Sequence, residues 1–442
     1  MYEKIINRVV SLHHYSFVRI IRQTLIIIFP IVFIGTMAKM ILKTFFKPDG
    51  FIYNIAFLDR IPQSVLRLID FMLTSIGQLT LGILGVYIVY IAADLTAKLY
   101  QRDGKFAGIT AILTLLLMAY RYDKLPSSPS FNFYQRLLNG NSLLFVLALG
   151  YGIGQFYRVL TPSQITFPQN GSNPNSLRLL QKRAFSSILP LIISISFGVV
   201  VAIFLNSNTI YHAWFNSYSS LVSAAQEHRQ LWLTLLASIG ITLMDWLGLG
   251  VPYSTMAMSG ESFTVNLNYA LAHGTPWNVP YKYLGSSLYN SFANFGGDGL
   301  ILALIVAILL TSNGSYMHRI ARWTVLPTLF NFNYATIIGL PVLFNPLFIV
   351  PFIFLPIINI LLASLAIAIH IIPSTPYPVL QGTPGPLIGF LGTNGNWGTL
   401  IFTLILLLLD IVAYLPFVKL ALKVEYRLTL EEEDVVSHGK NN

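Results

Sequence analysis

One stretch of the chain combines the apolar character of a membrane segment with an unusual number of helix breakers and amides. Residues 327–356 read PTLFNFNYATIIGLPVLFNPLFIVPFIFLP, in which Asn331 and Asn333 flank a phenylalanine and Gly339 and Pro341 interrupt the apolar run. Backbone groups freed by a broken helix cannot face lipid, so such breaks survive at membrane depth only against protein or a water-filled cavity. Short hydrophobic segments interrupted by Gly or Pro are typical of transporter binding sites. We therefore predict a ligand site in this stretch.

The composition indicates a polytopic membrane protein. Of the 442 residues, 55% are hydrophobic and 10% are charged, whereas about 25% of residues are charged in soluble domains. The absence of cysteine excludes disulfides, thiolate catalysis and cysteine-ligated metals. We predict an all-α fold of about ten transmembrane helices plus two re-entrant hairpins, because apolar stretches of about 20 residues recur along the chain.

Several apolar stretches are expected to cross the membrane. They are residues 24–42, 71–95, 106–120, 142–160, 184–205, 231–250, 299–311, 346–372 and 398–420. Residues 2–22 are amphipathic and basic, which predicts a helix in the membrane interface. Residues 211–229 are amphipathic and aromatic and are expected at the opposite surface. Residues 251–283 are less hydrophobic and are expected to form a re-entrant or discontinuous segment.

The pattern divides the chain into three parts. Residues 1–183 form an N-terminal membrane half. Residues 184–430 form a C-terminal membrane half with the amphipathic helix, the re-entrant hairpins and the ligand site, and residues 431–442 form a soluble cytoplasmic tail. The glycines of the span 142–160 predict close helix packing rather than ligand contact.

The distribution of basic residues predicts the orientation. The net charge is +10, which in a membrane protein is interpreted through its loops rather than as nucleic-acid binding. Lys and Arg gather before residue 24, at 98–105 and 158–183, and again near 319–322 and 423–427. Alternating spans place these segments on one side, which predicts that both termini are cytoplasmic. The basic stretch 39–67 argues against this orientation.

The interrupted stretch also carries a family pattern. Its sequence FN-x-N-x-x-x-x-x-GLP-x-x-x-NP-x-x-x-x-PF resembles the signature of the enzyme IIC (EIIC) permeases of the bacterial sugar phosphotransferase system (PTS). The lactose/cellobiose/diacetylchitobiose branch is the most similar. Further similar pieces occur in the same order as in that branch. They are Phe29-Pro30, LGSSLYN at 284–290, GGDG at 296–299, and YLPF at 414–417 with Lys419.

The resemblance fails at the residues that handle the proton. That branch has a glutamate after the second asparagine, where this chain has Tyr334 and Ala335. Its Gly-Ile-His-Gly motif matches residues 248–251, so Gly250 stands in place of the histidine. In the family these two side chains are associated with holding the sugar hydroxyl that becomes phosphorylated. Neither role transfers to this chain, so we name no catalytic residue and expect weak or no coupled phosphorylation.

Asn331, Asn333 and Tyr334 are the candidate ligand residues of the interrupted stretch. An amide carries two donors and an acceptor, which match sugar hydroxyls. The alternative is that both amides only satisfy backbone groups of the broken helix. Tyr334 can stack on a pyranose face, but its reference pKa of about 10 excludes it as a base near neutral pH.

Three carboxylates lie in apolar surroundings, where a charge is costly and often functional. Asp245 is a candidate for substrate contact, with a structural hydrogen bond as the equal alternative. Asp298 precedes an apolar helix, where an acidic residue suits the positive end of the helix dipole. Asp410 requires a partner within the bundle, such as His370 or an arginine.

The resemblance implies a permease that binds an oligosaccharide outside, carries it across the bacterial cell membrane and presents it to a phosphorylated IIB protein. Separate IIB and IIA proteins and a homodimer formed through the first half are the implied partners. The alternative is a degenerate homologue that acts as a sugar-binding receptor, sensor or scaffold without phosphotransfer. No cofactor, metal or nucleic acid is expected, because no nucleotide-binding or metal-binding motif is present.

Overall fold

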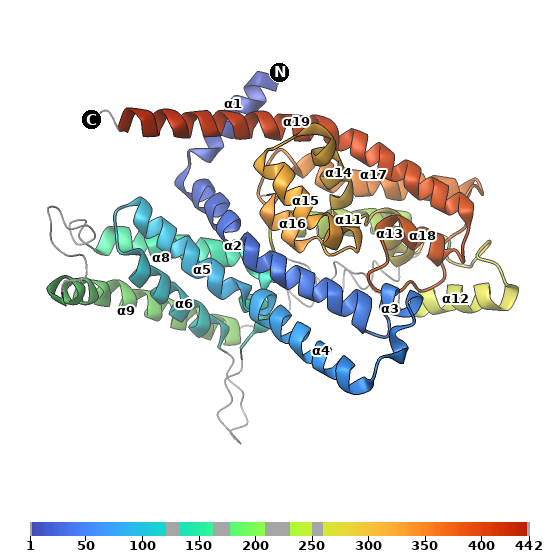
Figure 1. The fold of residues 1–442 in the computed structure, drawn as a ribbon, viewed down its shortest axis with the longest axis horizontal. Coiled ribbons are helices and arrows are strands. Elements are labelled where there is room, and N and C mark those ends of the chain that lie inside the picture. Colours follow the sequence, from blue (N-terminus) through green and yellow to red (C-terminus); the bar gives the residue numbers. More distant parts are fainter. Residues whose placement is uncertain are drawn as a thin grey trace.

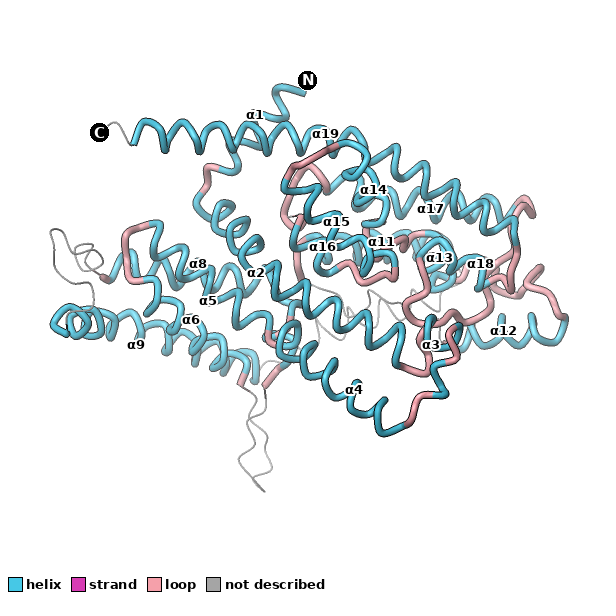
Figure 2. The backbone as a smooth tube through the Cα atoms, viewed as in Figure 1, coloured by secondary structure: helices cyan, strands magenta, loops and turns pink. Residues whose placement is uncertain are grey.

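The computed structural model describes residues 2–120, 133–161, 177–207, 230–249, 260–340 and 342–439. Within these ranges the elements are helices, and β-pairing is limited to two isolated bridges, Gly50 with Gln381 and Tyr120 with Phe133. Figure 1 shows two groups of helices with α2 running between them, and Figure 2 shows the loops that join the helices. The predicted all-α fold is confirmed. The expected amphipathic helix at 211–229 lies outside the described residues.

The helices follow the apolar stretches of the sequence. The first part contains α1 (Tyr2–His13), α2 (Ser16–Ile41), α3 (Phe51–Ile55), α4 (Gln63–Gly77), α5 (Leu84–Leu99), α6 (Gly104–Ala119), α7 (Gln135–Leu138) and α8 (Leu143–Leu160). The second part contains α9 (Leu177–Ser207), α11 (Leu231–Trp246), α12 (Glu261–His273), α13 (Gly285–Phe292), α14 (Ile301–Thr311), α15 (Tyr316–Leu329), α16 (Tyr334–Gly339), α17 (Ile349–Ala368), α18 (Gly385–Gly392) and α19 (Trp397–Gly439).

Six helical runs in the described residues are long and apolar enough to cross a membrane. They are Ser16–Phe46, Gln63–Leu99, Gly140–Leu160, Gln181–Phe204, Ile349–Ala368 and Trp397–Glu431. The apolar helices α6, α11 and α14 are shorter. The multi-pass character is therefore clear, whereas the number of about ten crossings stays a prediction.

The expectation that residues 299–311 cross the membrane alone is wrong. Helix α14 has 11 residues, which extend about 16 Å at 1.5 Å per residue, whereas the hydrocarbon core is about 30 Å thick. Its residues Ile301 to Ile305 are all buried. The strong apolar character of α14 therefore reflects burial among protein side chains rather than contact with lipid.

The first group of helices packs closely around α5. Gly150 on α8 lies so near α5 that an added Cβ would be 2.8 Å from the Val89 carbonyl oxygen, and Gly154 is similarly close to Thr96. Small residues let helix backbones approach in this way, which confirms the predicted packing role for Gly150 and Gly154. For Gly152 the prediction is wrong, because nothing lies within 4 Å of its added Cβ. Arg183 on α9 forms an ion pair with Asp103, which also caps the N-terminus of α6.

Helix α1 lies across the C-terminal part of helix α19 (Figure 1). Arg427 near the end of α19 donates to Glu3 at 2.5 Å and to Asn7 at 2.6 Å on α1. His14 and Glu431 approach to 3.6 Å beside this contact. Both ends are therefore on the same side of the bundle. Residues 431–439 of the expected tail continue helix α19.

Candidate functional site

The site is built around the loop 294–300, which connects α13 to α14 and is called the glycine loop below. Gly296, Gly297 and Gly299 have φ values of 78°, 92° and 75°. Glycine adopts this left-handed region without the steric penalty that other residues pay. The sequence GGDG therefore allows a tight loop that no ordinary side chains could form at these three positions.

The interruption predicted in residues 327–356 is present and contacts the glycine loop. Helix α15 ends at Leu329, α16 has only six residues, and α17 begins at Ile349. We call residues 327–340 the hairpin. Its two arms are joined by a hydrogen bond of 2.7 Å between the hydroxyl groups of Thr328 and Thr336.

Asn331 holds the glycine loop to a third segment. Its Oδ1 atom accepts a hydrogen bond of 2.8 Å from the Gly296 N–H group, and its Nδ2 atom donates one of 2.8 Å to the Thr383 carbonyl. Asn331 itself has a φ of 66°. Both ends of the Asn331 amide thus form hydrogen bonds with backbone groups. This fits the alternative that the amide only satisfies backbone groups of the broken helix.

Asn333 lies deeper and is less firmly engaged. Its side chain is 7% exposed, and its Nδ2 atom donates a long hydrogen bond of 3.4 Å to the Asp298 carbonyl. The amide covers Gly297 so closely that an added Cβ there would lie 2.2 Å from Nδ2. Since this hydrogen bond is long, the Asn333 amide is the one better placed to exchange its partner for a ligand.

A third piece of the family pattern reaches the same loop. Tyr414 of α19 donates a hydrogen bond of 2.6 Å to the Gly299 carbonyl and is fully buried. The segments containing GGDG, FNFN and YLPF, which lie far apart in the sequence, therefore meet at the glycine loop. The residues that carry the family pattern are packed together in space.

Asp298 projects from the glycine loop into the interior. The Tyr289 hydroxyl donates a hydrogen bond of 2.6 Å to its Oδ1 atom, and the residue is 1% exposed. Its Oδ2 atom is buried with no hydrogen-bond partner among the described residues. The expected capping role is wrong, because Oδ1 bonds to Tyr289, Oδ2 bonds to no described residue, and the N-cap of α14 is Leu300 without a side-chain cap.

Asp245 reaches the site from the last turn of α11. This end of α11 is hydrogen-bonded to the segment that follows the hairpin. The Phe344 N–H group donates to the Trp246 carbonyl at 3.3 Å, and the Trp246 indole donates to the Asn345 carbonyl at 3.3 Å. Asp245 is half-buried. Its carboxyl group faces that of Asp298, so the structure brings together two acidic residues that are 53 positions apart.

Tyr334 joins this cluster from the first position of α16. Its hydroxyl oxygen is buried without a hydrogen-bond partner among the described residues, and Asp245 is its charged neighbour. The hydroxyl lies against Gly140, where an added Cβ would be 1.5 Å away. Since Gly140 belongs to the first half of the chain, the cluster sits where the two halves meet.

The predicted residues therefore converge, and the structure adds others. Asn331, Asn333, Tyr334 and Asp245 all lie on or beside the glycine loop. Tyr289 and Asp298 complete the cluster, although no local sequence signal indicates that Asp298 faces Asp245. Gly250, the position of the missing histidine, lies outside the described residues.

Asp410 belongs to a different contact. Its Oδ2 atom accepts a hydrogen bond of 2.8 Å from Asn359, which also donates to the Phe292 carbonyl at 3.1 Å. The expected partner His370 is instead stacked on Trp277. Asp410 therefore fastens α19 to α17 and α13 rather than pairing with a base.

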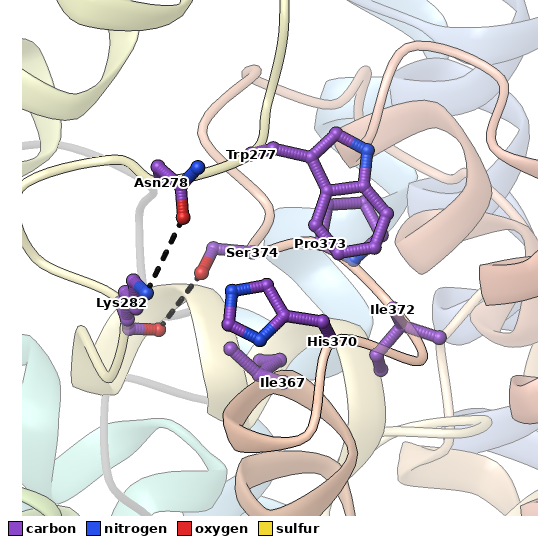
Figure 3. Close-up of a pocket in the computed structure, with 8 residues that line it drawn as sticks. All are labelled: Trp277, Asn278, Lys282, Ile367, His370, Ile372, Pro373 and Ser374. Carbon is purple, nitrogen blue, oxygen red and sulfur yellow. Dashed lines mark hydrogen bonds between the residues drawn. The ribbon is translucent and has the colours of Figure 1, made fainter.

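A separate surface hollow lies between the segment before α13 and the segment after α17 (Figure 3). Its lining residues are Trp277, Asn278, Lys282, Ile367, His370, Ile372, Pro373 and Ser374. The rings of Trp277 and His370 are nearly parallel, at 9° with centroids 6.2 Å apart. The interior cluster, with its buried carboxyl and hydroxyl groups, is the stronger candidate site.

Comparison with known proteins gives relatives along the whole chain, although no family model matches. The oligo-beta-mannoside-specific EIIC component of the PTS of Bacillus subtilis (strain 168) is 23% identical over 452 residues, which are 99% of this chain and 97% of that protein. The cellobiose-specific EIIC component of Lactococcus lactis subsp. lactis (strain IL1403) is 34% identical over 137 residues, 31% of this chain and 28% of that protein. The crystal structure of ChbC, the IIC component from the N,N'-diacetylchitobiose-specific PTS, aligns with a TM-score of 0.42 at 20% identity, covering 96% of each chain.

The fold and the site define a class of protein: a multi-pass helical membrane protein with a polar site built from interrupted helices in its interior. The likeness to an EIIC component extends over almost the full length of both chains. The chain is therefore similar to the EIIC membrane components of the PTS.

Proposed function

We propose that the chain is a sugar permease that binds an oligosaccharide at the cluster of Asn333, Tyr334 and Asp245 and carries it across the cell membrane. The observation that carries the proposal is the convergence of these three side chains at the glycine loop, where the two halves of the chain meet. Amide, hydroxyl and carboxyl groups placed together in an otherwise apolar interior are typical of a site for a small polar ligand. Intramembrane carboxylates commonly mark substrate pathways.

The relatives support the oligosaccharide class. Relatives that match this chain include components specific for oligo-beta-mannoside, cellobiose and lactose. We infer a substrate from this group. By the same reasoning we infer that IIB and IIA proteins are its partners. The Lys and Arg residues gathered in alternate loops support cytoplasmic termini.

Uptake by cells tests the proposal. The chain is expressed in a host that lacks its own transporters for cellobiose, lactose and diacetylchitobiose, and the accumulated sugar is assayed for phosphate. We expect uptake of at least one of these sugars above the empty-vector control. Saturable binding without uptake would instead support the receptor alternative, and neither binding nor uptake would overturn the proposal.

A further inference from the structure

The strongest observation outside the family pattern is the pair of facing carboxyl groups. Asp245 comes from α11 and Asp298 from the glycine loop, and each is the charged neighbour of the other. The polar side chains that surround them are Tyr289, bonded to Asp298 Oδ1, and Tyr334 beside Asp245. Among the described residues no Lys, Arg or His acts on either carboxyl group.

Electrostatics limits the charge that this pair can carry. Two carboxylates in a dry interior repel one another and lack the solvation that an ion requires, so one of them retains a proton when the other ionises. A buried pair of acids that shares one proton is a recurring arrangement at sites that handle protons. The hydrogen bond from Tyr289 favours negative charge on Asp298, and the half-buried Asp245 is the more accessible partner.

Two polar atoms at the pair lack partners, which is the second observation. The Oδ2 atom of Asp298 and the hydroxyl oxygen of Tyr334 are both buried, and neither makes a hydrogen bond among the described residues. A buried polar group without a hydrogen-bond partner destabilises the protein. Asp298 Oδ2 and the Tyr334 hydroxyl both lie beside the Asp245 carboxyl group. A ligand hydroxyl group that entered here would form hydrogen bonds with them.

We propose that Asp245 and Asp298 share one proton and that the pair binds a substrate hydroxyl, accepting its hydrogen bond on the ionised oxygen. The inference rests on the proposed function for the identity of the ligand. The pair then offers one proton acceptor and one proton donor. In the family that this chain resembles, a glutamate and a histidine provide such a proton acceptor and donor. Tyr334 and Gly250, which stand at those positions here, cannot provide them.

Binding of cellobiose, oligo-beta-mannoside and lactose to the purified full chain tests the ligand half of the inference. Asp245→Asn and Asp298→Asn are compared with Asp410→Asn, which replaces a buried acid outside the pair. Loss of a hydrogen bond to a charged group lowers affinity about 10- to 150-fold. We expect this loss in the first two variants and wild-type affinity in the third. Wild-type affinity in both pair variants, with folding intact, would overturn the ligand half.

Infrared difference spectroscopy at neutral pH tests the shared proton without any sugar. A neutral carboxylic acid has a carbonyl stretch that an ionised carboxylate lacks. We expect wild type and Asp410→Asn to share one such band that shifts or disappears in Asp245→Asn and in Asp298→Asn. Addition of a bound sugar should shift the same band. An identical band in all four proteins would overturn the shared proton.

The two measurements separate the inference from the proposed function. If wild type binds none of the sugars but the band depends on Asp245 and Asp298, the proposed function fails and the shared proton is supported. If wild type binds sugar but neither the band nor the affinity changes in Asp245→Asn and Asp298→Asn, the proposed function stands and the inference fails.

Discussion

The hydroxyl group of Tyr334 lies against the backbone of Gly140, leaving no space for a side chain at that position. Tyr334 begins α16 in the second half of the chain, and Gly140 precedes α8 in the first half. A second contact lies beside it, since the Leu144 N–H group donates to the Gly248 carbonyl at 3.4 Å. The candidate site is therefore sensitive to how the two halves are placed.

Gly140→Ala should displace Tyr334 and loosen the junction of the halves. The added Cβ would lie 1.5 Å from the hydroxyl oxygen and 2.4 Å from the ring carbon that carries it, and a rigid ring cannot yield without moving as a whole. Overpacking of this kind costs about 1–3 kcal/mol. Thermal unfolding in detergent is the measurement.

Gly152→Ala is the matched control, because nothing lies within 4 Å of its added Cβ. Alanine is the better helix former by about 1 kcal/mol, so this variant should be at least as stable as wild type. Equal melting temperatures for the two variants would show that Tyr334 does not press on Gly140.

Asn331→Ala and Asn333→Ala should separate structure from binding. The first change leaves the Gly296 N–H group and the Thr383 carbonyl without their partner, at about 1–3 kcal/mol for each unsatisfied group, so the melting temperature should fall. The second change breaks one long hydrogen bond and should weaken sugar binding about 5- to 150-fold, with expression and oligomeric state unchanged.

Calorimetric titration with disaccharides and a melting curve for each variant decide between these roles. If Asn333→Ala binds every sugar like wild type but melts at a much lower temperature, its amide is only structural. The proposed contact between Asn333 and sugar would then be wrong.

Local signals in the sequence predicted the apolar helices and the interruption. The expected spans 346–372 and 398–420 contain α17 and the first half of α19, because long apolar runs are decided by composition over many residues. The break in residues 327–356 was predicted from Gly339 and the asparagines, since these residues disfavour a continuous helix wherever the rest of the chain lies.

Contacts between distant segments were beyond the reach of local signals. Asp298 was expected to cap α14 because it directly precedes an apolar run, but the positive φ of Gly299 and Leu300 turns it toward Tyr289 and Asp245. Asp410 was given a basic partner because a charge requires one, and the neutral amide of Asn359 supplies the hydrogen bond instead. A single sequence shows which residues need partners but not which partners they find.

Any coupled phosphorylation in wild type should depend on Asp245. A positioned base typically contributes about 10²–10⁴-fold to such a transfer, and Asp245 is the accessible carboxyl group of the cluster. Asp245→Asn should therefore reduce the phosphorylation rate measured with a matching phosphorylated IIB protein by about this factor. An unchanged rate would exclude Asp245 as the base.

Tyr334→Glu is the complementary change at the same site. It restores the glutamate of the family but leaves Gly250 where the family has its histidine, so it should not bring phosphorylation to the level of a typical EIIC component. Tyr334→Phe should affect sugar binding mildly if the ring stacks on the sugar, and Tyr334→Ala severely. A fully active Tyr334→Glu variant would show that the glutamate alone suffices.

The chain should be a homodimer that associates through its first half. Helix α4 in the first half exposes large apolar side chains, including Leu68, Phe71 and Met72, and these must face lipid or a second copy. Light scattering in mild detergent measures the mass of the protein alone, after correction for bound detergent. A mass of one chain would contradict the dimer.

Equilibrium binding of radiolabelled cellobiose to the purified full chain tests the central claim most directly. Unlabelled lactose, oligo-beta-mannoside and diacetylchitobiose serve as competitors, and Asn333→Ala and Asp245→Asn serve as site variants. The account predicts saturable binding of one sugar per chain that at least one competitor displaces and that both variants weaken at least about fivefold. Absence of saturable binding for all four sugars, or binding that neither variant changes, would contradict a sugar site at the glycine loop.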